Sequence, residues 1–364
     1  MFDDKVYIIA ELGVNHNGKL QDAYDLIEAA SYAGADAAKL QLFDSEKLVS
    51  RDMVATIYQK KNAKGIKTQY ELLKGLQLGF EEVRKLKDFS KSNNLDFIVS
   101  PFDIGSLQYL LDLGVDYIKI ASGEIINAPL LWRAGKSRKK LILSTGMATL
   151  QEVETALAIV NHSLNSEREP RNLNEIWQFW SQKNPIEKLK RLVALLHCTS
   201  QYPTPLDNVN LKAIDTLKDA FKCEVGYSDH TIGSLVSVAA VARGAKIIEK
   251  HLTLNKHLKG PDHIVSAEPD EFRNMVEQIR HLEKVIGDGQ VICSNPEKEL
   301  LGKVRQRIVA LKGISKGEII SKDNITTCRS TKGLSAIHFW DCVGQEAASD
   351  CAAGDEVVFN KRLE

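Results

Sequence analysis

Eight short runs of β-branched and aliphatic residues, separated by longer segments of helical period, constrain the fold of this chain more than any other feature. The runs are residues 6–10, 37–42, 96–100, 116–121, 140–145, 192–198, 223–229 and 246–253. Strands that are apolar on both faces and separated by helices form a parallel sheet. Eight such units within roughly 280 residues predict a closed (β/α)8 barrel of the TIM-barrel type.

A doubly wound open sheet is the alternative that the same alternation allows. Its nucleotide-binding form carries G-x-G-x-x-G in the first turn from strand to helix. That turn reads "AELGVNHNGKL" (residues 10–20) here and lacks the fingerprint. The sequence therefore favours the closed barrel.

Residues 164–191 interrupt the rhythm between the fifth and sixth strands. This insert is polar and adds a helical piece that holds Trp177, Phe179 and Trp180. We interpret it as a lid or an interface element.

The C-terminal part of the chain has a different period, with short strands and turns such as "ISKGEII" (314–320) and "CAAGDEVV" (351–358). This pattern is typical of a small β-rich domain. We therefore expect a barrel over 1–287, a linker over 288–302 and the small domain over 303–364.

Charge and cysteine content exclude several classes of protein. The 48 Lys and Arg residues balance 48 Asp and Glu residues, so no net field favours nucleic acid or an anionic membrane. The N-terminus lacks the pattern of a signal peptide, and no apolar run reaches the roughly 18 residues of a membrane span. The six cysteines have neither zinc-ligand spacing nor the density of a disulfide scaffold. We expect a cytoplasmic protein.

Two lysines, Lys39 and Lys119, lie within otherwise apolar strands, where an unpaired ammonium is costly. A lysine stem that reaches along the strand to solvent is the ordinary alternative. Hydroxyl groups and a glycine at the same strand ends favour an anion site instead, for a phosphate or a carboxylated phosphate ester. These residues are Ser100, Ser122, Gly123, Ser144 and Ser228.

Histidines follow the last two predicted strands, in "GYSDHT" and "EKHLTL". His230 and His251 are either polar caps of two strands or ligands that converge on one metal ion. Imidazoles at a barrel mouth suit Mn²⁺, Zn²⁺ or Fe²⁺, and two ligands suggest an open site completed by water and substrate. Glu11, Glu124 and Asp262 lie at the same end as acid–base groups or acceptors for sugar hydroxyls.

Nine motifs carry a resemblance to a known family. They are, in chain order, "IIAELGVNHNG", "AGADAAKLQ", "VSPFD", "YIKIASGE", "STGM", "LLHCTSQYPTP", "GYSDHT", "EKHLTL" and "GPDH". In this order they resemble the sialic acid synthase family, and "KGEIISKDNITTCR" resembles the antifreeze-like (SAF) domain of these enzymes. Members condense phosphoenolpyruvate with an N-acetylated hexosamine to give a nine-carbon 2-keto sugar acid.

The resemblance implies a role for each site residue. It places phosphoenolpyruvate on Lys39, Ser100, Lys119, Ser122, Gly123, Ser144, Ser200, Tyr202 and Ser228. It places Mn²⁺ or Mg²⁺ on His230 and His251, and the sugar near Gln41, Glu124, Tyr202 and Asp262. It also implies a domain-swapped homodimer in which Arg329 approaches the N-acyl group of the sugar in the partner's barrel.

The expected reaction releases phosphate by C–O cleavage, with Glu124 handling the proton at the new hydroxyl and Glu11 activating water. The sugar is N-acetylmannosamine or a 2,4-diacetamido-6-deoxy hexose, and "TQYELLK" (68–74) resembles legionaminate synthases and favours the second. A metal-dependent aldolase or isomerase on the same barrel is the rival function and would release no phosphate. A sugar-binding module without catalysis is the other, suggested only by the small C-terminal domain.

Overall fold

The computed structural model describes residues 5–55, 67–182 and 187–360. The chain divides into two compact units, residues 1–287 and 288–364. Each unit has a hydrophobic core of its own. No helix in the described ranges has the length and apolar character needed to cross a bilayer.

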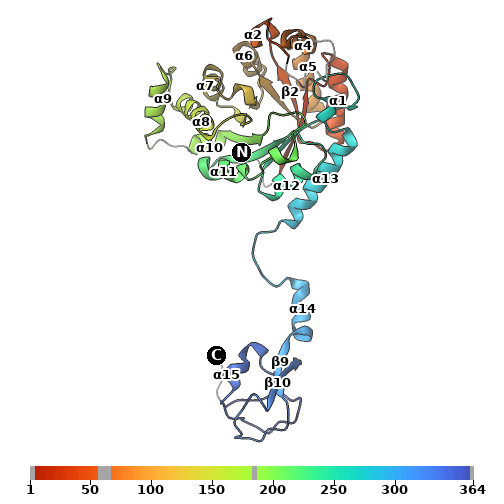
Figure 1. Cartoon of the computed structure of the whole chain (residues 1–364), viewed down its shortest axis with the longest axis vertical. Helices are drawn as coiled ribbons and strands as arrows, with labels where there is room; N and C mark the ends of the chain where they lie inside the picture. The colour runs from red at the N-terminus through yellow and green to blue at the C-terminus, as the bar shows by residue number, and fades with distance from the viewer. Residues whose placement is uncertain (1–4, 56–66, 183–186, 361–364) are drawn as a thin grey trace. The chain divides into compact units, whose positions relative to one another are not determined.

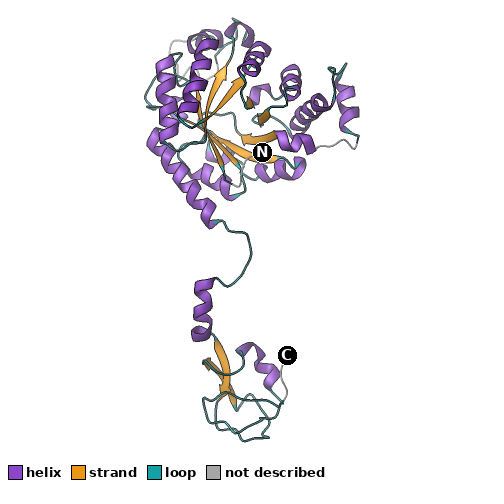
Figure 2. Ribbon diagram, turned by 180° about the vertical axis from the view of Figure 1, so that it is seen from behind, coloured by secondary structure: helices purple, strands orange, loops and turns teal. Residues whose placement is uncertain are grey.

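The first unit is a closed barrel of parallel strands (Figure 2). The strands are β1 Tyr7–Gly13, β2 Ala37–Leu42, β3 Asp96–Pro101, β4 Tyr117–Ile120, β5 Lys140–Ser144, β6 Val193–Cys198, β7 Glu224–Asp229 and β8 Ile247–His251. Each strand pairs with the next, and β1 pairs with β8 from Tyr7 opposite Ile247 to Glu11 opposite His251. This last pairing closes the sheet, so the predicted barrel is confirmed and the open sheet is excluded.

Helices surround the barrel and connect its strands (Figure 1). They are α1 Leu20–Tyr32, α2 Ser45–Leu48, α4 Gln69–Leu76, α5 Phe80–Ser92, α6 Ile104–Leu113, α7 Ala128–Lys136, α8 Leu150–Asn165, α9 Leu173–Trp180, α10 Glu187–Leu192, α11 Ala213–Phe221, α12 Leu235–Ala242 and α13 Pro269–Val285. Short 3-10 turns lie at η1 Ser122–Glu124, η2 Leu206–Asn208 and η3 His263–Val265.

Local sequence signals fix where these helices begin and end. Thr149 and Glu152 form a capping box that starts α8, and the Asp103 carboxylate accepts the Ser106 N–H to start α6. Gly114, at φ 73°, ends α6 in the left-handed conformation that glycine adopts without strain. These signals hold the strand ends, and therefore the residues that follow them, in fixed places.

Two layers of apolar side chains follow from the period of two along each strand. Inward residues fill the barrel and outward residues pack against the helices. The inner layer consists of Ile9, Ala37, Ile98, Tyr117, Ile142, Ala194, Leu196 and Ile247. Most of the next inward residues toward the C-terminal ends are polar, so the barrel has an apolar interior and a polar mouth.

The insert packs on the outside of the barrel, where α9 lies beyond α8 (Figure 1). Ile176 of α9 is buried, and the Trp180 indole N–H donates to Glu154 of α8 at 3.0 Å. No described residue of 164–191 lines the cavity at the barrel mouth. The apolar side chains of the described part of the insert pack against the outer helices, and its role as a lid or an interface element stays a prediction.

The second unit contains the antiparallel pair β9 Gln306–Ala310 and β10 Ile325–Arg329. Its helices are α14 Asn295–Val304 and α15 Phe339–Cys342, with a 3-10 turn, η4, at Ala336–His338. A small core includes Ile308, Ile325 and Val357. Since α14 begins within the expected linker, part of that segment is helical.

Candidate active site

A cavity of about 490 Å³ opens at the C-terminal ends of the barrel strands. Every site residue that the sequence predicted within the barrel lines it. These residues are Glu11, Lys39, Gln41, Ser100, Lys119, Ser122, Gly123, Glu124, Ser144, Ser200, Tyr202, Ser228, His230, His251 and Asp262. Arg329 belongs to β10 of the second unit, where it is exposed. The alternation of inward and outward residues thus brings the barrel set together.

Buried charges of both signs occupy the floor of this cavity. Lys39 pairs with Glu11, and its Nζ lies 3.6 Å from Glu249 Oε2. Lys119 Nζ lies 3.3 Å from Glu249 Oε1 and donates to Ser144 Oγ at 2.7 Å. Ser228 Oγ donates to Glu249 Oε1 at 2.8 Å. The two lysines therefore point inward at one level and share Glu249 between them.

Glu249 is the central residue that the sequence analysis did not select. It is buried, and the Lys119 and Lys39 ammonium groups hold its pKa below the ordinary value although burial alone would raise it. Its signal in the sequence was its place two residues before His251, which puts both side chains on the inward face of β8. Two buried lysine ammonium groups need a nearby negative charge to offset the cost of their burial, and Glu249 supplies it.

Glu11 differs from Glu249 in the direction of its pKa shift. Burial raises the pKa of Glu11, and the charge on Glu249 adds to this effect against the opposing pull of Lys39. Gln41 Nε2 donates to Glu11 Oε1 at 2.9 Å. Two carboxyl groups in one cavity thus have pKa values shifted in opposite directions, which is typical of groups that divide acid–base work.

The hydroxyl groups around the lysines suit an anion. Ser100 Oγ is buried and has no hydrogen-bond partner among the described residues. The Gly146 N–H donates to Ser122 Oγ at 3.1 Å, and a Cβ at Gly146 would meet Ser200 Oγ at 2.5 Å. Glycine at this position therefore lets three strand ends approach closely around the space beside Ser122.

His230 and His251 face each other across the ends of β7 and β8, with ring centroids 5.4 Å apart. His230 Nδ1 donates to the Thr199 carbonyl at 2.8 Å, which leaves Nε2 of the neutral ring with a free lone pair. Burial lowers the pKa of His230 to about 4 and lowers that of His251 well below its usual range. Both rings are therefore neutral at pH 7, as metal ligation requires.

The environment of the histidines fits a metal ion. His251 Nδ1 is buried without a hydrogen-bond partner among the described residues, 3.8 Å from Asp262 Oδ2. Burial raises the pKa of Asp262 to about 7. No three His, Cys, Asp or Glu side chains in the described ranges form a closed metal site. Two neutral imidazoles beside a carboxyl group match an open site completed by non-protein ligands.

Apolar side chains form one wall of the cavity, on the connection from β2 to α5. This apolar wall consists of Leu48, Val49, Leu72, Leu73 and Leu76. Gln69 is the polar residue of α4 that joins them in the lining. The cavity thus has charged and hydroxyl groups at its floor and an aliphatic surface at its side.

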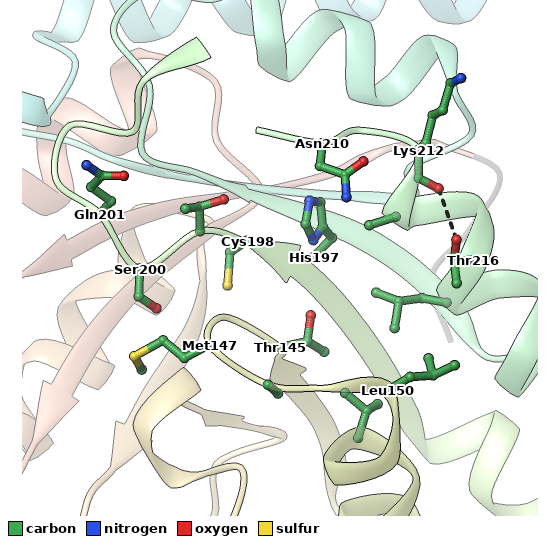
Figure 3. A pocket seen from close by; sticks show the side chains of 15 residues that line it. Thr145, Met147, Leu150, His197, Cys198, Ser200, Gln201, Asn210, Lys212 and Thr216 are labelled. Atoms are coloured by element: carbon green, nitrogen blue, oxygen red, sulfur yellow. Dashed lines mark hydrogen bonds between the residues drawn. The ribbon is translucent and has the colours of Figure 1, made fainter. Parts of the chain in front are cut away.

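A second and larger cavity, of about 690 Å³, lies between the ends of β5 and β6 and helices α8 and α11 (Figure 3). Two of its polar groups are already engaged: Thr145 Oγ1 donates to the Leu196 carbonyl at 3.1 Å, and His197 Nε2 lies 2.8 Å from the Val209 carbonyl. Figure 3 shows the Lys212 ammonium turned away from the other labelled side chains. The side chains that line this second cavity include fewer acidic and basic groups than those that line the barrel mouth.

Comparisons with known proteins agree with this geometry. A model of the NeuB family matches residues 26–291, and a model of the SAF domain matches residues 305–361. The chain is 42% identical over 346 residues to an N,N'-diacetyllegionaminic acid synthase of Campylobacter jejuni, covering 95% of this chain and 97% of the relative. It is 40% identical over 353 residues to a protein of the same name from Legionella pneumophila, covering 97% and 93%.

A solved structure shows the same likeness. It is that of an N-acetylneuraminic acid (sialic acid) synthetase from Leptospira borgpetersenii in complex with citrate. The two chains are 35% identical, with a TM-score of 0.67, over 82% of this chain and 90% of the other. The resemblance found in the sequence motifs is confirmed.

Proposed function

The chain belongs to the NeuB family of synthases that condense phosphoenolpyruvate with an amino sugar, and we propose that its sugar is a 2,4-diacetamido-6-deoxy hexose, giving a legionaminic acid. The observation that carries this choice is the apolar wall beside the charged floor of the cavity. N-acetylmannosamine, giving N-acetylneuraminate, is the alternative sugar.

The lysine floor supports phosphoenolpyruvate as the anionic substrate. Lys39 and Lys119 offer two cations at one level, for a phosphate and a carboxylate. The hydroxyl of Ser100 has no partner of its own and Ser144 already orients Lys119. The remaining groups of this proposed site are Ser122, Gly123, Ser200, Tyr202 and Ser228.

His230 and His251 are the residues that would hold a divalent metal, Mn²⁺ or Mg²⁺, at the edge of this floor. When bound there, such an ion supplies Lewis-acid polarisation of a carbonyl oxygen. The chain's own contribution is to keep both imidazoles neutral and fixed, through the bond from His230 to the Thr199 carbonyl and through burial.

The proposed reaction joins C3 of phosphoenolpyruvate to the aldehyde carbon of the open-chain sugar. Water then adds at C2, and the bond from C2 to the phosphate oxygen breaks, so phosphate leaves. Glu11, with its raised pKa, would accept the proton of that water. Glu124, whose Oε2 accepts the Asn127 side-chain amide at 2.6 Å, would serve the new hydroxyl, near Gln41 and Asp262 of the sugar site.

The two sugars differ at C4, where the deoxy sugar carries an acetamido group in place of a hydroxyl, and at C6, and the sugar choice rests on how the aliphatic wall treats C6. A 6-deoxy sugar ends in a methyl group, which the apolar wall covers without loss. A 6-hydroxyl against the same wall would lose its hydrogen bonds to water. An apolar pocket rejects one added hydroxyl by about 10²-fold at most. We therefore expect kcat/KM for the deoxy sugar to exceed that for N-acetylmannosamine by ten- to a hundredfold.

Phosphate release measured with each sugar tests this proposal. Leu73→Asn, which adds a polar group to the wall, should narrow the preference for the deoxy sugar, whereas Leu173→Asn at an exposed position of α9 should leave that preference unchanged. A preference for N-acetylmannosamine in the unaltered enzyme would refute the sugar choice. Turnover without phosphate release would instead favour the rival aldolase or isomerase.

We also propose a cytoplasmic homodimer. All six cysteines are free, as is usual in a reducing compartment. Large apolar side chains stand exposed on loops around the barrel mouth, including Met147, at 74% exposure, and Ile232, at 67%. An exposed apolar group of this kind supports a docking partner at the mouth. In the proposed dimer the partner's small domain covers it and brings its Arg329 to the sugar.

A further inference from the structure

Asp229 and Lys250 form a buried ion pair that the reaction described above does not use. They lie opposite each other in the pairing of β7 with β8, and both side chains are at most 2% exposed. Each directly precedes a histidine of the proposed metal site. Because alternate residues of a strand face opposite sides, the pair points outward into the helix layer while His230 and His251 point into the cavity.

The Lys250 ammonium contacts the residues on both sides of His230. It lies 2.9 Å from Asp229 Oδ2 and donates to the Thr231 carbonyl at 2.8 Å. Asp229 Oδ1 accepts the Thr231 N–H and the Thr231 hydroxyl, each at 2.8 Å. Ser237 of α12 donates to Asp229 Oδ2 at 2.6 Å. The turn that carries His230 is thus attached, through one side chain, to the residue before His251.

These contacts couple the two histidines mechanically. A rotation of the His230 backbone would break the bonds to Thr231, and a shift of β8 would carry Lys250 and His251 together. The hydrogen bond from His230 Nδ1 to the Thr199 carbonyl fixes the orientation of the His230 ring but does not connect that ring to β8. Within the described residues, the Asp229–Lys250 ion pair links the ends of β7 and β8 through side chains on the outer face of the sheet.

We propose that Asp229 and Lys250 are positioning residues that set the separation and mutual orientation of the His230 and His251 rings for a divalent cation. The inference rests on the proposed metal role of the two histidines. Outer partners that orient metal ligands typically change metal affinity by 10- to 100-fold when removed. A pair that served only the fold would change stability and leave the affinity of the folded protein unchanged.

The test measures Mn²⁺ binding to metal-free protein from the loss of the free-ion electron paramagnetic resonance signal. Asp229→Asn/Lys250→Met removes both charges together, since either single change leaves a buried charge without its partner. We expect its Kd for Mn²⁺ to rise by about 10- to 100-fold. Phosphoenolpyruvate affinity, measured without metal by calorimetry, should change less than threefold.

The matched control is Asp36→Asn/Arg280→Met, which removes a partly buried ion pair at the opposite end of the barrel. It should lower the melting temperature without changing the Kd for Mn²⁺. If the Asp229/Lys250 variant does not fold, Ser237→Ala decides, because it removes one bond to Asp229 from α12 and should raise the Kd at least threefold.

An unchanged Kd in the folded double variant, or in Ser237→Ala when the double variant is unfolded, overturns the positioning role. Absence of Mn²⁺ binding by the unaltered protein is a different result. It would refute the proposed metal site itself, and with it the premise of this inference.

Discussion

Lys119 is buried against a single carboxylate, Glu249, and one hydroxyl, Ser144. Removing its ammonium takes away a charge-assisted contact to the proposed anion and leaves Glu249 less compensated. We expect Lys119→Ala to raise KM for phosphoenolpyruvate and to lower kcat/KM by about 10²-fold or more. Steady-state kinetics with each substrate varied checks this, with Lys87→Ala on α5 as a control outside the cavity. An unchanged KM for phosphoenolpyruvate would place the anion elsewhere.

Asp262 predicts a loss of stability toward alkaline pH. Its folded pKa is raised to about 7 by burial, so the stability it contributes is present below its unfolded pKa, near 4, and is lost as pH rises toward 7. His230 and His251 have lowered pKa values and act in the opposite direction, on acidification.

Asp262→Asn should therefore become more stable relative to the unaltered, metal-free protein as the pH rises. The relative gain should be about 2 to 3 kcal/mol between pH 5 and 8, from the pKa difference in that range. Urea unfolding at the two pH values measures it. The histidine contributions cancel because both proteins retain them. A difference that does not depend on pH would mean that Asp262 is ionised in the folded protein.

At the scale of elements, α9 contributes to stability by packing against the outer helices. Ile176 is 2% exposed between α9 and the outer helices, so Ile176→Ala should lower the free energy of unfolding by about 2 to 4 kcal/mol. The kinetic constants should stay unchanged at a temperature where the variant is folded, because α9 does not line the cavity. Leu173→Ala, at an exposed position of the same helix, is the control for both measurements.

Strand alternation made most of the barrel and its site predictable. The apolar runs defined β1 to β8 to within a few residues, and polar residues at their C-terminal ends identified the groups that line the cavity. Glu249 stood at the end of the eighth predicted strand but was assigned no role, because its neighbours in sequence, Ile248 and Lys250, carry no sign of the inward-facing lysines that it will meet. Such pairings depend on neighbours in the sheet, such as Lys119 of β4, that are far apart in sequence.

The structures of the insert and the linker were harder to predict from the sequence because they depend on packing against other parts of the chain. The aromatic residues of 164–191 predicted a helix with an apolar face but not the surface that it would cover. In the linker, Ser294 and Glu297 form a capping box that starts α14, a signal that a composition-based reading of the segment passes over.

At the scale of the whole molecule, the proposed dimer places the small unit of one chain at the barrel of its partner. Two variants that are impaired in different units should therefore complement each other. Arg329→Ala should lower turnover while leaving the barrel folded, since Arg329 is exposed on β10. In the proposed dimer, mixing impaired Arg329→Ala chains with impaired Lys119→Ala chains would give hybrids that have one intact site each. We expect partial recovery of activity after subunit exchange. No recovery, with exchange shown by labelled subunits, would argue that each chain serves its own barrel.

The charge balance of the cavity floor makes substrate capture a proton-linked event. The positive charges of Lys39 and Lys119 are already paired with the carboxyl groups of Glu11 and Glu249. Phosphoenolpyruvate brings about three further negative charges, from a carboxylate and a phosphate. The cavity can offset part of this charge by taking up a proton at Asp262, whose pKa burial already raises to about 7. Binding heats in buffers of different ionisation enthalpy should then diverge, and affinity should fall as the medium becomes more alkaline.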